Sequence, residues 1–248
     1  MRCAVSGRCS MGKSVFIVGT DTDVGKTYVT GLIVKKLRES GTTAAYFKAA
    51  MSGNARDEEG KLIPGDALAV KRMSGISQPL EKMCPYVYEQ AVSPHLAARW
   101  EDRPVCLSRI LAEFQALCAA YEYVTMEGAG GILCPMRFDG GEETGSGSAG
   151  EELWLPQVIK ACGAGCLLVA DAGLGVINHV GLTAFYMKER GIDLRGIIFN
   201  HYRPGDRMQE DNLRMCEHLT GVPVVACVED GCKDLEISCE RLKALYHE

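Results

Sequence analysis

The sequence lacks the cysteine patterns of a disulfide-stabilised or zinc-binding protein. Its 12 cysteines stand singly, within apolar stretches such as those around Cys118, Cys166 and Cys227. No two have the C-x-x-C spacing, and no group of cysteines and histidines has the spacing of a zinc site. We therefore interpret the thiols as reduced, small apolar side chains, which indicates a cytoplasmic protein.

Long apolar runs and basic runs are also missing. No apolar run is long enough to span a bilayer, and the first ten residues lack the apolar stretch of a signal peptide. The net charge is −5, with acids and bases spread along the chain, so no basic surface for nucleic acid is expected. We expect residues 1–13 to form a disordered extension and residues 14–248 to form a single domain.

Apolar, β-rich stretches alternate with helical patterns along the 248 residues. Continuous apolar strands indicate a sheet covered on both faces, and the alternation indicates parallel order with helical crossovers. We therefore predict an α/β fold with a mostly parallel β-sheet flanked by helices on both faces. Strands are expected at 14–19, 43–48, 123–128, 166–171, 195–200 and 222–228, helices at 26–40, 66–73, 93–100, 108–121, 178–191 and 234–248, and a mobile surface loop at 138–152.

Two stretches match a phosphate-binding loop, which needs a buried strand before it and a helix after it. Residues 6–14, SGRCSMGKS, fit the strict pattern G-x-x-x-x-G-K-[ST], but a β-rich segment follows where a helix is needed, which indicates a chance match. Residues 19–27, GTDTDVGKT, have one residue more between the glycines, yet both neighbours are right. This loop predicts a P-loop NTPase-like fold, in which Lys26 reaches the β- and γ-phosphates and Thr27 can bind Mg²⁺.

Charged residues at other strand ends could complete the site. Glu127 ends a strand and is suited to hold Mg²⁺, and the small residues after it let the backbone approach a nucleotide. Lys48 ends the second strand at the edge where ligands bind, although it could equally be a surface lysine. Asp66 stands at the start of a predicted helix, where it could serve either as the N-cap or as a metal ligand. The acids Asp21 and Asp23 would repel a triphosphate unless they serve a cationic amine or a metal.

Six motifs occur in an order that is typical of one family. They are GTDTDVGKT, YFKAAMSG, GDALA, SPHLAA, EGAGG and GVINH. The phosphate loop alone is shared by many nucleotide enzymes, whereas its combination with SPHLAA and GVINH is much more specific. Over residues 14 to about 230 the chain resembles the dethiobiotin synthetases, ligases of biotin biosynthesis with a deviant P-loop.

The resemblance implies a reaction of 7,8-diaminopelargonate, CO₂ and ATP with Mg²⁺. One amine captures CO₂ as a carbamate, and the γ-phosphoryl group of ATP activates it as a carbamic–phosphoric anhydride. The second amine then closes the ureido ring of dethiobiotin and releases phosphate. Positive charge beside the carbamate and the phosphoryl group stabilises an anion that becomes more negative toward the transition state.

The resemblance also assigns roles to residues. The catalytic residues would be Lys26, Lys48, Thr22 and Asp23, the last two near the diamine. Mg²⁺ would be held by Thr27, Asp66 and Glu127, and Asn200 would read the purine base. ATP would further contact Asp23, Val24, Gly25, Tyr28, Gly128, Ala129, Gly130, Glu229 and Asp230. Ser52 would contact the substrate, and Gly175, Val176 and Asn178 would bind its carboxylate tail from the other subunit of a homodimer.

Three residues depart from the family pattern. Asp23 is often glutamate, so its carboxylate is one methylene shorter. Ala49 stands where proline usually follows the strand lysine, which loosens the backbone. His201 stands where aspartate is common, and it could change the base preference.

Two other functions fit parts of the sequence. A deviant P-loop switch ATPase that positions partners or DNA usually carries a second lysine early in its loop, and TDTDVGKT has none. An amide ligase of cobyrinate type normally brings a glutamine-hydrolysing domain, for which 248 residues leave no room.

Overall fold

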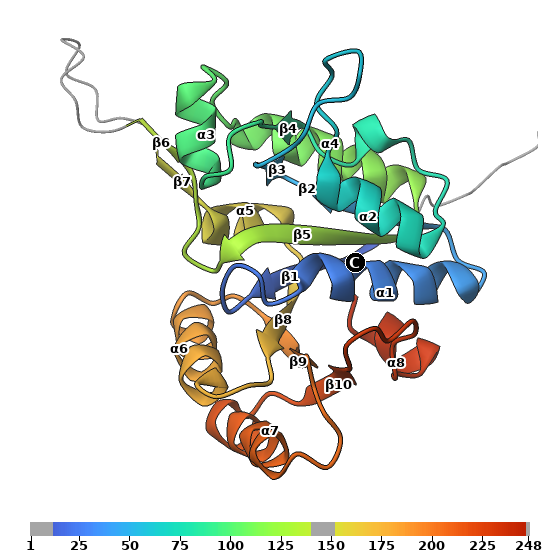
Figure 1. Cartoon of the computed structure of the whole chain (residues 1–248), viewed down its shortest axis with the longest axis vertical. Coiled ribbons are helices and arrows are strands. Elements are labelled where there is room, and N and C mark those ends of the chain that lie inside the picture. The colour runs from blue at the N-terminus through green and yellow to red at the C-terminus, as the bar shows by residue number, and fades with distance from the viewer. Residues whose placement is uncertain (1–11, 140–151, 247–248) are drawn as a thin grey trace, which may run out of the picture.

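Six parallel strands form the central sheet of this computed structural model, which describes residues 12–139 and 152–246 (Figure 1). In spatial order they are β10 (Val224–Val228), β9 (Leu194–Asn200), β8 (Gly165–Asp171), β1 (Lys13–Gly19), β5 (Tyr123–Gly131) and β2 (Ala44–Lys48). Every pairing between neighbours is parallel. The predicted parallel α/β fold is therefore confirmed, and each of the six predicted strands is present.

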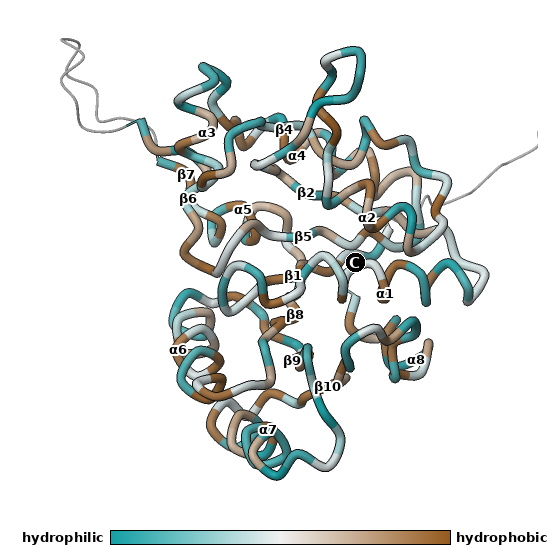
Figure 2. The backbone as a smooth tube through the Cα atoms, in the orientation of Figure 1, coloured by the Kyte–Doolittle hydropathy of each residue, from teal (hydrophilic) through white to brown (hydrophobic). Residues whose placement is uncertain are grey.

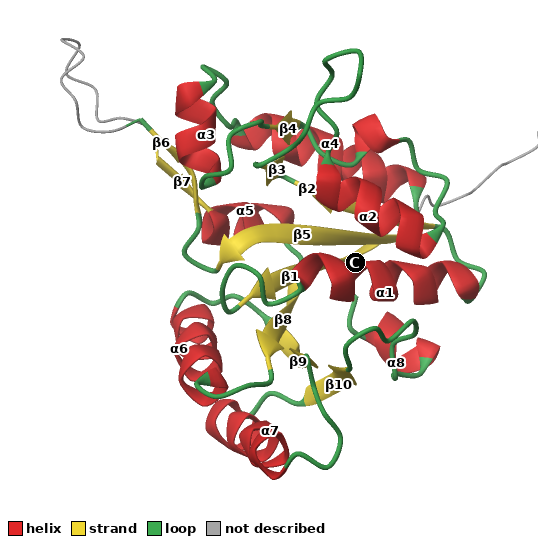
Figure 3. Cartoon of the chain, in the orientation of Figure 1, coloured by secondary structure: helices red, strands yellow, loops and turns green. Residues whose placement is uncertain are grey.

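Helices cover both faces of the sheet (Figure 3). Successive side chains of a strand point to opposite faces, so Phe16 and Val18 of β1 join one core cluster and Val15 and Ile17 join the other. The first cluster lies under α3 (Pro94–Trp100), α4 (Leu107–Ala120), α5 (Leu155–Cys162), α6 (Val176–Glu189) and α7 (Arg207–Thr220), and the second under α1 (Lys26–Glu39), α2 (Gly65–Ser74) and α8 (Cys239–Ala244).

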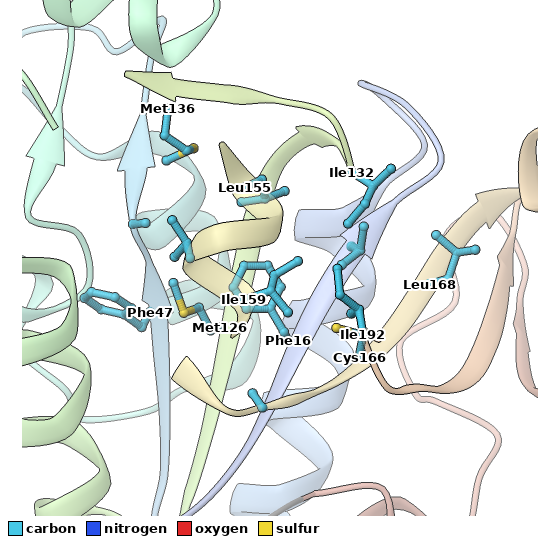
Figure 4. Packing of buried hydrophobic residues seen from close by; sticks show 14 of the residues in the cluster. Phe16, Phe47, Met126, Ile132, Met136, Leu155, Ile159, Cys166, Leu168 and Ile192 are labelled. Carbon is cyan, nitrogen blue, oxygen red and sulfur yellow. The ribbon is translucent and has the colours of Figure 1, made fainter. Parts of the chain in front are cut away.

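The first cluster shows how the apolar strands hold a helix. Leu155 and Ile159 of α5 lie over Phe16 of β1 and Met126 of β5 (Figure 4). These four side chains are almost completely buried. Each such side chain contributes about 1.5–3 kcal/mol on leaving water, so this contact fixes the two strands that carry the candidate site.

Short elements complete the structure at its edges. β3 (Ala50–Met51) pairs with β4 (Tyr86–Val87), and η1 (Leu80–Lys82) lies between them in the sequence. β6 (Pro135–Phe138) and β7 (Glu152–Trp154) form an antiparallel pair. The ends of the predicted surface loop at 138–152 therefore belong to strands, while its residues 140–151 lie outside the described residues, as do residues 1–11 of the expected N-terminal extension.

The helices differ from the prediction in three places. α5 and α7 were not predicted, because α5 is short and the buried residues of α7 are chiefly polar, with Gln209 and Asn212 beside Cys216. The last helix is shorter than the predicted 234–248, since α8 begins only after Ser238, whose hydroxyl accepts from Arg241 N. In α3 the N-cap residue is Ser93, whose hydroxyl contacts His95 Nδ1 and does not cap the helix.

Candidate active site

The candidate site lies at the edge of the sheet where β1, β2, β8 and β9 end, whereas β5 continues to Gly131, so Glu127 lies within its strand and does not end it as predicted. Lys48 of β2 is paired with Glu127 of β5, and Glu127 is also paired with Ile17 of β1. Further along the same edge, Asp171 of β8 is level with Asn200 of β9. Because the strands are parallel, functional residues that are distant in the sequence meet here.

The phosphate-loop sequence forms the expected strand–turn–helix. The chain leaves β1 at Gly19 and enters α1 through Gly25, which has a left-handed φ of 86°. A β-carbon at Gly25 would lie 2.0 Å from Asn200 Nδ2, so this position needs glycine for space as well as for conformation. Of the rejected first motif, Lys13 and Ser14 belong to β1 and open no helix; its residues 6–11 lie outside the described part.

Lys26, the first residue of α1, points back along the loop. Its Nζ donates to Asp21 O at 2.6 Å, and only 7% of the residue is exposed. Burial and the nearby charge of Lys48 lower the pKa of Lys26. Lys26 and Lys48 line the same cleft, and a negatively charged ligand bound between them would relieve their repulsion.

Lys48 is held between two carboxylates. Its Nζ lies 2.6 Å from Glu127 Oε1 and 2.6 Å from Asp66 Oδ2. Burial by itself lowers the pKa of Lys48, but the Glu127 and Asp66 carboxylates outweigh burial and raise the pKa above its ordinary value. Lys48 is therefore a permanently charged, fixed group and not the surface lysine that remained possible from the sequence.

Asp66 does not cap α2. The N-cap residue is Pro64, and Asp66 is the second residue of the helix. Its side chain, 40% exposed, turns to Lys48. Of the two roles that the sequence left open for Asp66, the N-cap is wrong and a role at the site remains.

Glu127 is the centre of a hydrogen-bond network. Its side chain is fully buried, and Oε1 accepts from the Thr27 hydroxyl at 2.8 Å as well as from Lys48. Its Oε2 accepts from Tyr46 OH at 3.0 Å. Since Thr27 donates its only hydroxyl hydrogen to Glu127, the lone pairs of its oxygen remain for another partner. Both oxygens of Glu127 are thus occupied by protein donors.

Tyr46 is a site residue that the sequence reasoning missed. It stands two residues before Lys48 on β2, so both side chains point to the same face. Burial and the Glu127 carboxylate raise the pKa of Tyr46 well above its ordinary value, so the hydroxyl keeps its hydrogen and donates. The alternation of a strand would have found this residue once Lys48 and Glu127 were chosen.

A cleft of about 510 Å³ joins most of the predicted site residues. Its predicted lining residues are Thr22, Asp23, Gly25, Lys26, Thr27, Tyr28, Lys48, Ser52, Asp66, Glu127, Ala129 and Gly130, and Ala50 and Met51 line it as well. Two predicted contacts face the interior instead. Val24 is buried in the core, and a β-carbon at Gly128 would meet Leu155 and Phe16. These two can offer a ligand only their backbone.

The predicted base-reading residues lie beyond Gly25. The Asn200 side chain is buried behind that glycine, and its Nδ2 donates to Val24 O at 3.1 Å. Glu229 and Asp230 are exposed in the loop after β10, where the Tyr28 hydroxyl donates to Cys232 O. The structure thus brings Asn200 and this loop close to Gly25 and Tyr28, which line the cleft.

The oxygen atoms of Thr27 and Asp66 suit Mg²⁺ only when a bound phosphate and water complete the coordination. Among residues 12–139 and 152–246, no group of three or more His, Cys, Asp or Glu could hold a metal ion by itself. Thr27 and Asp66 nevertheless offer a hydroxyl and a half-exposed carboxylate, which are hard oxygen ligands. Magnesium is commonly held by one or two such groups, with phosphate and water completing the octahedron.

The predicted tail-binding residues do not join the cleft of their own chain. Gly175, with a φ of 95°, is the N-cap of α6, and Asn178, the third residue of the helix, is exposed. The Val176 N–H is not free as expected, because it donates to Gly173 O at 3.3 Å. Large apolar side chains are exposed nearby: Leu174 (90%) before α6, Leu182 (62%) and Phe185 (65%) of α6, and Leu219 (57%) of α7. The tube in Figure 2 carries hydrophobic as well as hydrophilic colours along both helices.

In the two ranges that the structure describes, none of the helices combines the length and the apolar character required to cross a membrane.

Comparison with known proteins gives a consistent set of relatives. The profile of a family described as AAA domain matches residues 13–231. An ATP-dependent dethiobiotin synthetase BioD of Clostridium botulinum is 40% identical over 238 residues, 96% of this chain and 100% of that protein. The protein of the same name from Clostridium kluyveri is 42% identical over 235 residues, 94% of this chain and 92% of the relative.

Solved structures share the fold at low identity. The cell division protein FtsY of Thermotoga maritima has a TM-score of 0.52 at 16% identity, over 96% of this chain and 69% of that one. The septum site-determining protein MinD of Pyrococcus horikoshii, solved in complex with Mg-ADP, has a TM-score of 0.51 at 15% identity, over 89% and 82%. At these identities the likeness concerns the fold alone.

Proposed function

This chain belongs to the ATP-dependent dethiobiotin synthetase family, and from that premise we infer how its cleft closes the ureido ring of dethiobiotin. The enzyme is a ligase of biotin biosynthesis that uses ATP to join CO₂ to both amines of 7,8-diaminopelargonate. The observation that best supports our assignment of residues is the convergence of Lys26, Lys48 and Glu127 on one cleft. The roles that follow are proposals built on that geometry.

We propose different tasks for the two lysines of the cleft. We propose that Lys26 leaves Asp21 O for the β- and γ-phosphates, a short movement that exchanges a neutral acceptor for an anion. Lys48 stays in place and faces the carbamate and the transferring phosphoryl group. Its fixed charge stabilises the transition state without reorganisation, which is the condition under which electrostatic catalysis is most effective.

We propose that Thr27, Asp66 and Glu127 would hold, directly or through water, the Mg²⁺ that accompanies ATP. When bound, the ion would neutralise charge on the phosphates. The Thr27 oxygen is suited to this role because its hydrogen is donated to Glu127 in a hydrogen bond, which leaves the oxygen lone pairs for the metal ion. Glu127, with both oxygens occupied, would act by orienting Thr27 or through water, and Asp66 is the more accessible carboxylate.

The diamine is proposed to lie beside Thr22, Asp23 and Ser52. All three line the cleft, and the Asp23 carboxylate is exposed there in a left-handed conformation with a φ of 59°. A carboxylate attracts an ammonium group and would hold the amine near the carbamate position. The acids that would repel ATP alone are thereby explained by a cationic substrate.

The proposed carboxylate site is shared between two subunits of a homodimer. Gly175, Val176 and Asn178 do not line the cleft of their own chain, and the exposed apolar side chains of α6 and α7 offer a surface for a second copy. We also propose a cytoplasmic location, because all ten cysteines in the described ranges are free thiols.

Mixed dimers would test the shared site. Lys48→Met and Asn178→Ala homodimers should both be impaired at low diamine concentration. Co-expressed together, they should recover about a quarter of wild-type activity, because random pairing gives half mixed dimers with one intact site each. Dethiobiotin formation by the purified mixture is the measurement. Lys48→Met with Lys26→Met is the matched control, which should recover nothing because both residues serve the same site. Recovery that is equal in both mixtures, or absent from both, would rule out the shared site.

The function itself is tested with diaminopelargonate, bicarbonate, Mg²⁺ and ATP. We expect one dethiobiotin and one phosphate per turnover, and no product when the diamine or Mg²⁺ is omitted. ADP release that ignores the diamine but responds to DNA or to a protein partner would instead favour the positioning ATPase.

A further inference from the structure

His201 follows Asn200 at the end of β9 and adopts an unusual backbone conformation. Its φ is 55°, in the left-handed region that residues other than glycine rarely occupy. Such a conformation persists only where the surroundings hold it. Here the ring is held on both sides, with Nδ1 at 2.6 Å from Asp171 Oδ2 and Nε2 at 3.1 Å from Asn200 Nδ2.

The Asn200 amide determines which ring nitrogen of His201 carries the hydrogen. Asn200 Nδ2 lies 3.1 Å from Val24 O, and since a carbonyl oxygen can only accept, the nitrogen of the amide belongs there. The same Nδ2 faces His201 Nε2 as a donor, so Nε2 must accept. The ring hydrogen is therefore on Nδ1 and is donated to Asp171. Asp230 Oδ1, at 3.8 Å from Nε2, is too far away to compete.

The hydrogen bond between Asp171 and His201 favours the ionised form of the Asp171 carboxylate. Burial by itself raises the pKa of Asp171, but the hydrogen bonds from His201 and from the Gly173 N–H, together with the electrostatic attraction of His201, outweigh burial, so the net pKa lies below its ordinary value. Asp171 is thus an ionised acceptor that keeps the hydrogen on Nδ1. The three residues form a chain of hydrogen bonds from β8 to the amide of Asn200.

This chain leaves one atom of the Asn200 amide free. Val24 O and His201 Nε2 use both hydrogens of Nδ2, whereas Oδ1 has no partner among the described residues. In those residues the only fully buried side-chain polar atom without a partner is Thr30 Oγ1, so Asn200 Oδ1 keeps some exposed surface although Asn200 as a whole is 2% exposed. Gly25 lines the cleft, and a β-carbon on it would lie 2.0 Å from Asn200 Nδ2 and 3.8 Å from Oδ1, so the whole amide lies next to the cleft wall.

We propose that His201 is a positioning residue that fixes the Asn200 amide so that only its acceptor, Oδ1, faces the nucleotide base. The matching group is a donor, the amino group at C6 of adenine. A carbonyl at C6, as in hypoxanthine or guanine, would set two acceptors against each other. This inference rests on the proposed base-reading role of Asn200 and adds that the enzyme reads the amino group at C6 and not the ring nitrogen N7.

Nucleotide analogues separate these two contacts in the wild-type enzyme. Inosine triphosphate carries a carbonyl at C6, and 7-deaza-ATP keeps the amino group but lacks N7. We expect kcat/KM to fall about tenfold with inosine triphosphate and to stay within about twofold with 7-deaza-ATP, since only the first loses a hydrogen bond. A loss with 7-deaza-ATP as large as that with inosine triphosphate would overturn the proposed readout.

Two substitutions at His201 distinguish positioning from general structure. Asparagine tolerates the left-handed conformation and can reach Asp171, but it is too short to accept from Asn200. Glutamine can extend an acceptor to the position of Nε2. We expect His201→Asn to lower the ratio of kcat/KM for ATP to kcat/KM for inosine triphosphate by about fivefold. The change should come from a higher KM for ATP, with kcat unchanged. His201→Gln should retain the ratio. His218→Asn, on the exposed end of α7, is the matched control.

Asn200→Ala distinguishes failure of this inference from failure of the proposed base site. If that variant loses the ATP preference while His201→Asn keeps it, Asn200 reads the base but His201 does not position it. If Asn200→Ala keeps the preference as well, both roles are refuted, even when dethiobiotin is still formed. Thermal unfolding of every variant shows whether a lost preference reflects a lost fold.

Discussion

Replacing Lys48 with methionine should lower the turnover number by about 10²–10³-fold at saturating substrates while ATP affinity changes little. The ammonium group lies 2.6 Å from each of two carboxylates and is 6% exposed, so it occupies one position before the substrates arrive. A charge that is already fixed loses nothing to reorganisation in the transition state. Dethiobiotin formation gives the turnover number, and ATP binding is measured separately by calorimetry.

Loss of stability has to be separated from loss of catalysis in this variant. Glu127 is fully buried, and removing its cation leaves an uncompensated charge that costs about 3 kcal/mol. Asp66 is 40% exposed and can turn to water, so its contribution is small. Lys48→Met combined with Glu127→Gln should therefore recover most of the melting temperature and none of the turnover. A Lys48→Met enzyme with near wild-type turnover would eliminate the catalytic role.

Local patterns were sufficient for the parts of the site that one strand or one turn defines. The order of strand, loop and helix around Gly25 and Lys26 is contained in a single stretch, and the structure agrees with it. Lys48 and Glu127 were chosen because both end a strand, and their pairing on adjacent strands follows from parallel order. The ion pair itself could not be predicted, because the order of β1, β5 and β2 is not encoded in a local pattern.

The parts that were missed depend on contacts between distant segments. Asp171 meets His201 only because β8 and β9 are neighbours, so no sequence spacing indicates that hydrogen bond. The pattern of residues 234–238 predicts a helix. In the structure, Lys35 and Lys36 of α1 donate to the carbonyls of Lys233 and Leu235, and these hydrogen bonds hold the chain in a loop. Tertiary contacts override the local helical pattern there.

Replacing Lys26 with methionine should impair both binding and catalysis, which distinguishes it from Lys48. A charge-assisted hydrogen bond to a phosphate is worth about 1.5–3 kcal/mol, so ATP affinity should fall by about 10- to 100-fold. Turnover at saturating ATP should fall by about a further 10²-fold, because the same group follows the γ-phosphoryl group into the transition state. Calorimetry with ATP and dethiobiotin formation measure the two effects.

The fold should tolerate this change. Lys26 is buried and is repelled by Lys48, so methionine removes an unfavourable charge and keeps the length of the side chain. The abandoned acceptor, Asp21 O, belongs to an exposed residue and can bind water. We therefore expect a melting temperature near that of wild type. Lys82→Met, at an exposed lysine of η1, is the control and should leave every property unchanged. Unaltered ATP affinity and turnover in Lys26→Met would mean that residues 19–27 do not hold the triphosphate.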